Sequence, residues 1–95
     1  MEQFSEIMER SFVELVDKRA DARGWRKGDF AKRVWPEASP KSAAGKWAAI
    51  RGIASNTGKP QGVLISDAQR IAEVLGEDLT YLLAVAKENA KKQAL

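Results

Sequence analysis

The chain has 95 residues, enough for one compact domain, and its hydrophobic and charged contents of 44% and 31% are typical of a folded protein. It contains no Cys and no His, which excludes disulfides, thiolate nucleophiles and the commonest zinc ligands and general bases. The net charge of +3 is too small to identify a partner by itself.

The longest apolar runs are far shorter than the roughly 20 residues that span a bilayer, and the acidic start of the chain is unlike a secretory signal. We therefore expect a single domain over residues 1–95, located in the cytoplasm, with no membrane segment. The neighbouring carboxylates Glu77 and Asp78 fit helix capping better than a catalytic pair. The sequence argues against an enzyme, and we expect no cofactor and no metal.

The first predicted helix covers residues 4–22, where apolar side chains recur every three or four positions. Gly24 follows it as a stop signal. The second predicted helix covers residues 26–34. It ends at Trp35-Pro36, because the residue before a proline is disfavoured in a helix.

The third predicted helix covers residues 40–51 and has the clearest start signal. Ser39 is a good N-cap, and Pro40 suits the first helical position, where no amide hydrogen is needed. Three residues are expected on its inward face, at helical spacing: Ala43, Trp47 and Ile50. The composition of residues 55–62 then predicts a long loop.

Two more helices are predicted after this loop. The fourth is expected to open at Ser66, with Gln69 as its capping-box partner. The fifth is capped by Asp78 and covers about residues 79–89. The tail, residues 91–95, is expected to fray.

Two short helices joined by a turn are typical of a helix-turn-helix. Three stretches of the sequence carry a further resemblance: residues 66–83, residues 23–34 and the pair Lys46-Trp47. In their order and spacing they resemble the phage-repressor family (Cro/C1-like, or XRE) over about residues 10–85. The resemblance implies an all-α, five-helix lambda-repressor-like DNA-binding domain with a helix-turn-helix.

The turn between the second and third helices departs from the family pattern. Members usually have a glycine there, whereas this chain has Trp35-Pro36. The family spacing would also bury Lys41, which is physically unreasonable, whereas a turn two residues longer buries Ala43 instead. The sequence leaves the burial of Trp25 and Trp35 open, because each lies next to a break between helices.

Charge is unevenly distributed along the chain. Residues 23–62 hold nine Lys and Arg against two acidic residues. Residues 1–22 hold three cations against six acids, and residues 63–95 hold four against five. A basic centre between neutral or acidic arms is expected of a phosphate-facing surface, whereas an ordinary solvated face would mix the two signs along the chain.

The outward side of the third helix provides the candidates for base contacts in a DNA major groove: Lys41, Ser42, Gly45, Lys46 and Ala49. A lysine reaches guanine acceptors, a serine bonds to either kind of base, and a glycine permits close approach. An ordinary surface helix explains the lysines, but it does not explain a glycine in mid-helix, which costs about 1 kcal/mol relative to alanine.

Four further cations are candidates for phosphate contacts: Arg26, Lys27, Arg51 and Lys59. Arg26 and Lys27 lie at the start of the second helix, where free amides attract an anion. Because a cation there opposes the helix dipole, an external phosphate is an attractive explanation for them. For Lys59, a mobile surface loop is an equally good interpretation.

These observations predict a sequence-specific regulator of transcription that binds double-stranded DNA as a homodimer, most simply a phage- or prophage-like repressor. The expected dimer surface is the apolar side of the fifth helix, including Leu82, Val85 and Leu95. Two alternatives remain open. One is an antitoxin of the same fold that also binds a toxin, and the other is a helical protein-interaction module that does not bind DNA.

Overall fold

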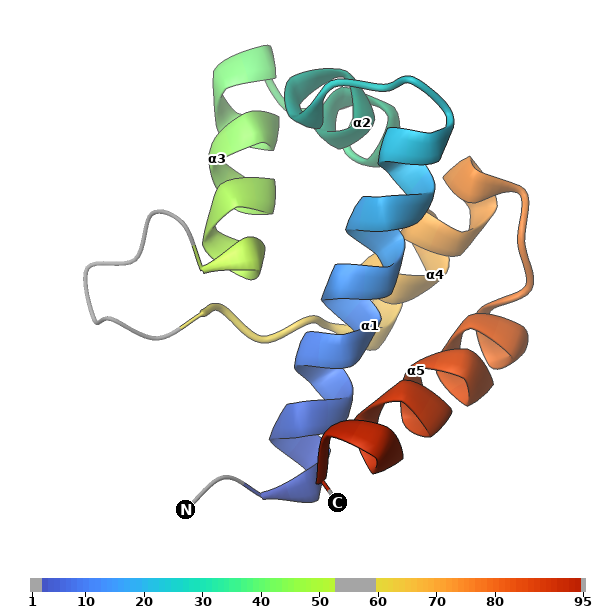
Figure 1. The fold of residues 1–95 in the computed structure, drawn as a ribbon. Coiled ribbons are helices and arrows are strands. Elements are labelled where there is room, and N and C mark those ends of the chain that lie inside the picture. The colour runs from blue at the N-terminus through green and yellow to red at the C-terminus, as the bar shows by residue number, and fades with distance from the viewer. Residues whose placement is uncertain (1–2, 53–59, 95) are drawn as a thin grey trace.

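Five α-helices form the fold in the computed structural model, which describes residues 3–52 and 60–94 (Figure 1). Within those residues there is no β-strand. The helices are α1 (Phe4–Ala22), α2 (Lys27–Val34), α3 (Pro40–Arg51), α4 (Ile65–Leu75) and α5 (Leu79–Ala94). The prediction of an all-α domain with five helices is confirmed, and the bounds of α1 and α3 agree with those expected.

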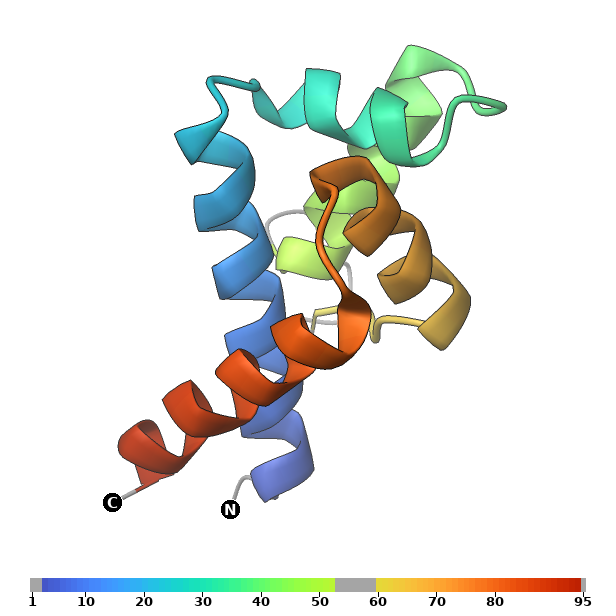
Figure 2. The same cartoon turned by 90° about the vertical axis from the view of Figure 1, so that its right-hand side faces the viewer.

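The longest helices, α1 and α5, pack against each other, so the described chain begins and ends at the same end of the molecule (Figures 1 and 2). Leu82, Ala86 and Ala90 are the buried residues of α5. Ala90 has no exposed surface, which explains why α5 continues to Ala94 and why the predicted end near residue 89 was wrong. Most of the tail that was expected to fray is therefore helical.

The dimer surface expected on α5 is also wrong at Leu82, because this side chain is completely buried and has no accessible surface for contact with a second copy. An apolar stripe on a terminal helix serves equally well as an intramolecular or an intermolecular face, and here the core uses it. Val85 is half-buried, and Leu95 lies outside the described residues.

The helices α2 and α3 share an aromatic core. The rings of Phe30 and Trp47 meet edge to face with their centroids 5.1 Å apart, and both side chains are buried. Trp25 is half-buried and stacks against Phe30, with the ring centroids 6.2 Å apart. As the sequence predicts, Ser39 caps α3 by accepting a hydrogen bond from the Ser42 amide at 3.1 Å, and Pro40 occupies the first turn.

The start of α4 differs from the prediction. Leu64 occupies the N-cap position, with no side-chain capping bond, and Ser66 is already helical, so the expected capping box is not formed. The cap expected for α5 is confirmed, because the Asp78 carboxylate accepts a hydrogen bond from the Tyr81 amide at 3.2 Å. α4 then ends at Gly76, whose left-handed backbone suits a glycine.

The chain returns to the core at residues 60–64. The Gln61 amide donates to the Ala49 carbonyl at 2.9 Å, and the Val63 amide donates to the Glu9 carboxylate at 3.0 Å. Arg10 donates to the carbonyls of Ile50 and Gln61. Most of the predicted loop, residues 55–62, lies outside the described residues. Among the described helices, none has the length and apolar character needed to cross a membrane.

Candidate nucleic-acid interface

The two sides of α3 are sharply different. Its inward residues Ala43, Trp47 and Ile50 are almost completely buried, as expected from their spacing. Its first two turns present exposed residues on the other side: Lys41, Ser42 and Gly45. The prediction that Ala43 is buried and Lys41 is exposed is therefore confirmed.

Gly45 occupies the middle of this exposed side and has no packing role within the described residues. A methyl group added at its Cα would find no heavy atom within 4 Å, and its backbone is not in the left-handed region. The helix therefore carries the cost of a central glycine, about 0.5–1 kcal/mol relative to alanine, without an internal benefit.

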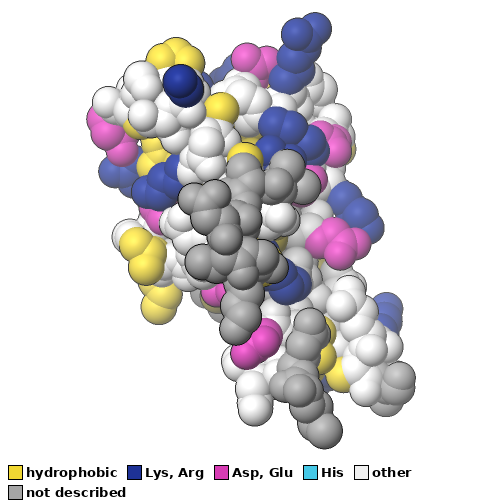
Figure 3. All heavy atoms as spheres, turned by 90° about the vertical axis from the view of Figure 1, so that its left-hand side faces the viewer, with side chains coloured by type: hydrophobic (Ala, Val, Ile, Leu, Met, Phe, Trp, Pro, Cys, Tyr) yellow, Lys and Arg dark blue, Asp and Glu magenta, His cyan; other side chains and the backbone are white. Residues whose placement is uncertain are grey.

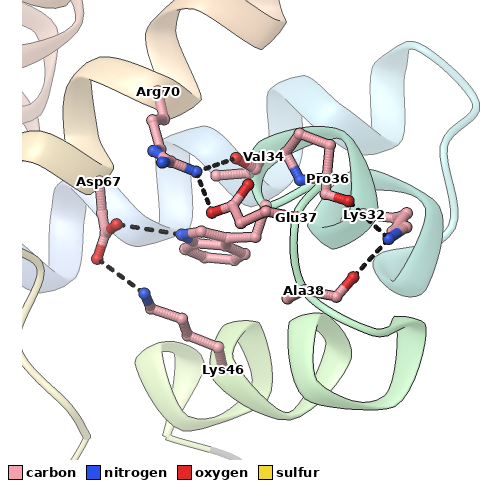
Figure 4. Close-up of polar contacts among 9 residues, drawn as sticks. Lys32, Val34, Pro36, Glu37, Ala38, Lys46, Asp67 and Arg70 are labelled. Atoms are coloured by element: carbon pink, nitrogen blue, oxygen red, sulfur yellow. Dashed lines mark hydrogen bonds and ion pairs between the residues drawn. The ribbon is translucent and has the colours of Figure 1, made fainter.

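The turn between α2 and α3, residues 35–39, is tied to α4 by a buried hydrogen bond. Trp35 is 2% exposed, and its indole Nε1 donates to the Asp67 carboxylate at 3.1 Å (Figure 4). Asp67 is itself 5% exposed. Because an unpaired buried carboxylate is costly, this pair fixes the turn relative to α4.

Lys46 completes the same cluster. Its ammonium nitrogen lies 3.7 Å from the second carboxylate oxygen of Asp67 and 4.9 Å from the centre of the Trp35 ring (Figure 4). This predicted base-contacting residue is therefore directed toward α4 and the turn. Its contacts balance the buried charge of Asp67 and add a cation–π interaction.

Two more side chains hold the turn from its flanks (Figure 4). Lys32 donates to the carbonyls of Pro36 and Ala38. Arg70 on α4 donates to the Val34 carbonyl at 3.2 Å and to the Glu37 carboxylate at 2.6 Å. A hydrogen bond from the backbone of Glu37 and this arginine together lower the pKa of the Glu37 carboxyl.

Lys27, predicted to bind phosphate, lies between two carboxylates of α1. Its nitrogen is 2.6 Å from Asp17 and 3.1 Å from Asp21. The hydrogen bond to Asp17, with a smaller contribution from Asp21, raises the pKa of Lys27. The unfavourable position of this cation at a helix start is thus compensated within the chain, and it needs no external anion.

The other predicted phosphate contacts differ in exposure. Arg26 is exposed at the N-cap of α2. Arg51 is half-buried at the end of α3, with its guanidinium 5.8 Å from the centre of the Trp47 ring. Lys59 lies outside the described residues, so its predicted contact has no structural counterpart here.

The fold cancels part of the charge that the sequence concentrates in residues 23–62. Arg23, Lys27 and Lys46 pair with acidic residues from outside this segment. In the view toward α3, lysines and arginines are scattered over the visible face among acidic side chains (Figure 3). In the described part of the segment, the cations without an ion pair are Arg26, Lys32, Arg33, Lys41 and Arg51.

The main residue that the sequence analysis missed is Asp67. It shares a helical face with Ala68, Ile71 and Leu75, all of them buried. A carboxylate on the apolar face of a helix predicts a buried partner, and that spacing was the available signal. Its partner Trp35 is distant in sequence and could not have been identified from local pattern.

The described residues contain no cluster of acidic side chains suited to a metal ion. None of the protein-family models, curated proteins or solved structures compared with this chain matches it.

Proposed function

We propose that this chain is a sequence-specific, double-stranded DNA-binding regulator in which α2, residues 35–39 and α3 act as a helix-turn-helix. The observation that carries the proposal is the exposed side of α3. There, Lys41, Ser42 and Gly45 form a polar, narrow surface on a helix whose opposite side is firmly packed in the core. A helix with these two sides suits insertion into a major groove about 12 Å wide.

Each exposed residue on α3 has a distinct role in this proposal. Lys41, in the first turn, donates to guanine acceptors, and Ser42 bonds to a neighbouring base edge. Gly45 lets the helix backbone approach the DNA closely, which gives the central glycine a function. Ala49, which is half-buried, contributes a small apolar contact.

Arg26 is the leading phosphate contact, because it is exposed beside the free amides at the start of α2. Arg51 is available for the backbone at the other end of α3. Lys27 and Lys46 act differently from the sequence-based prediction: they position α2 and α3 through Asp17, Asp21 and Asp67.

On the resemblance of the sequence to the phage-repressor family, we propose that the chain acts as a repressor in the cytoplasm. One α3 helix contacts only a few base pairs, so we expect a dimer on a two-fold operator.

Fluorescence anisotropy with a duplex selected from a random pool tests this proposal. We expect the double variant Lys41→Ala/Ser42→Ala to lose about 2–4 kcal/mol of preference for the selected duplex over a scrambled one. The control is Lys87→Ala/Lys92→Ala, which removes exposed cations from α5 and should preserve that preference. Full preference in the α3 variant would contradict the assignment of α3.

Salt dependence gives a second measurement. If three or four of the unpaired cations other than Lys41 contact phosphates, affinity should fall on the order of 100-fold between 50 and 200 mM salt. An affinity that does not change over this range would exclude binding through the DNA backbone.

A further inference from the structure

A second surface, separate from the exposed side of α3, is an apolar groove between α1, α4 and α5. It has a volume of about 260 Å³. Its apolar lining includes Met8, Phe12, Val63, Ile65, Leu79 and Leu83. Part of the groove floor is formed by Phe12, which is 3% exposed and belongs to the core.

Large apolar side chains near the groove in sequence are exposed to solvent. Ile65 is 83% exposed and Leu64 is 62% exposed. Phe4 is 39% exposed and lies one helical turn before Met8 on α1. Of the four large exposed hydrophobic residues in the described ranges, Ile65 lines the groove, and Leu64 lies in the chain between the lining residues Val63 and Ile65.

The groove carries little free charge. The one charged residue in its lining is Glu9, and both oxygens of that carboxylate are engaged within the chain. One accepts a hydrogen bond from the Val63 amide at 3.0 Å, and the other pairs with Arg10 at 3.2 Å. An acidic or basic partner would therefore find no complement here, whereas two identical copies can meet without repulsion.

We propose that this groove binds the same groove of a second copy of the chain, through an interface with two-fold symmetry. Such an interface requires a patch that is complementary to itself. The projecting Ile65 and Leu64 stand beside a hollow of matching character, so the projection of each copy can enter the hollow of the other. The choice of a second copy also rests on the proposed DNA-binding function, which requires a dimer.

A dimer interface of ordinary size would cover a moderate share of the surface of this chain. A stable interface covers about 800 Å² of each partner, roughly an eighth of the 6071 Å² of accessible surface of this chain. The lining residues come from α1, α4, α5 and the segment before α4. The leading alternative surface, on α5, is already used by the core at Leu82.

The position of the groove also leaves α3 free. α4 begins at the edge of the molecule (Figure 2), and hydrophobic side chains project at one edge of the face that carries α3 (Figure 3). The molecule measures 40 × 32 × 23 Å.

Sedimentation velocity of the full chain over a range of concentrations tests the proposal, with Ile65→Glu as the variant. Ile65 is mostly exposed and lies in the first turn of α4, where the helix dipole stabilises an acidic side chain. The variant should therefore fold. We expect the dissociation constant of the dimer to rise about tenfold or more. Tyr81→Glu adds the same charge at an exposed residue outside the groove lining and should leave the dimer unchanged.

The outcomes separate this inference from the proposed function. A wild-type chain that stays monomeric at every concentration contradicts the dimer surface, even if it binds DNA with the expected salt dependence. A dimer that Ile65→Glu does not weaken contradicts it as well, and points to a different surface. A dimer weakened by Ile65→Glu in a protein without DNA affinity supports the surface and rejects the proposed function.

Discussion

Along α5, the side chains that the core buries are Leu82, Ala86 and Ala90, and packing of small and apolar groups joins this helix to α1. The connection from α2 to α3 is built differently. Trp35 in the turn is joined to Asp67 by a buried hydrogen bond, and Lys46 of α3 contacts both residues. Apolar packing is tolerant of small shifts, whereas hydrogen bonds are directional. The first region therefore chiefly stabilises the domain, and the second fixes the position of α3.

The largest expected effect concerns the first region. Leu82→Ala should lower the free energy of unfolding by about 2–5 kcal/mol, because it removes a completely buried side chain and leaves a cavity. Urea unfolding followed by circular dichroism measures this loss. At a temperature where the variant is still folded, its DNA affinity should equal that of the wild type. A selective loss of DNA affinity would show that the two regions are not separable.

Asp67→Ala tests the second region. It leaves the Trp35 Nε1 donor without its partner and should cost about 1–3 kcal/mol of stability. Hydrogen exchange should accelerate at amides of α3 more than at amides of α5. Asp67→Asn is the matched control, since an amide oxygen can still accept from Trp35 while the charge that faces Lys46 is lost. If both variants lost the same stability and exchanged α3 amides equally fast, the charge of Asp67 rather than its hydrogen bond to Trp35 would position α3.

Gly45→Ala changes α3 but leaves the contacts among Trp35, Lys46 and Asp67 in place. Because an added methyl meets no atom of the described residues, stability should rise by about 0.5–1 kcal/mol. If the helix backbone approaches DNA closely, affinity for the selected duplex should fall in the same variant. Thermal unfolding measures the gain in stability, and fluorescence anisotropy measures the loss of DNA affinity. A variant that gains stability and keeps full affinity would remove close approach as the explanation for the glycine.

Lys27→Met should have the smallest effect on stability. It should lower the free energy of unfolding by less than about 1 kcal/mol, because the lysine side chain is 40% exposed and its ion pairs are screened by solvent. The pKa of Lys27 is raised above its ordinary value of 10.5. Its contribution is therefore complete below that pH and is lost as the pH rises through the raised value.

Urea unfolding at about pH 7 and about pH 11 should show the difference between wild type and variant becoming smaller. Arg26→Met provides the control, because Arg26 is an exposed neighbour without an ion pair in the described residues. A difference that stays constant with pH would mean that Lys27 acts through its methylene groups.

Local patterns predicted most of the fold. Periodicity and capping located the five helices, and the choice of Ala43 over Lys41 for the core followed from the cost of burying a charge. The positions of individual charges were less predictable. Lys27 and Lys46 are paired with residues on α1 and α4, and such contacts depend on how the helices pack rather than on neighbouring sequence.

The same limit explains the errors in the predicted site. A count of charge along the chain treats every lysine in residues 23–62 as available, although the fold uses several of them internally. Trp35 and Leu82 were ambiguous for a related reason, because an apolar residue at a turn or on a terminal helix can face either the core or a partner.

The anchoring of residues 60–63 has a consequence for how this domain can diversify. Gln61 is bonded to Ala49 at the end of α3, and Glu9 and Arg10 of α1 hold residues 61 and 63. Both ends of the intervening segment are therefore fixed independently of its length. Insertions between residues 52 and 60 are therefore expected to leave the contacts of residues 61 and 63 with α1 and α3 intact. This position is a natural place to graft a peptide tag or a new binding loop while α3 keeps its orientation.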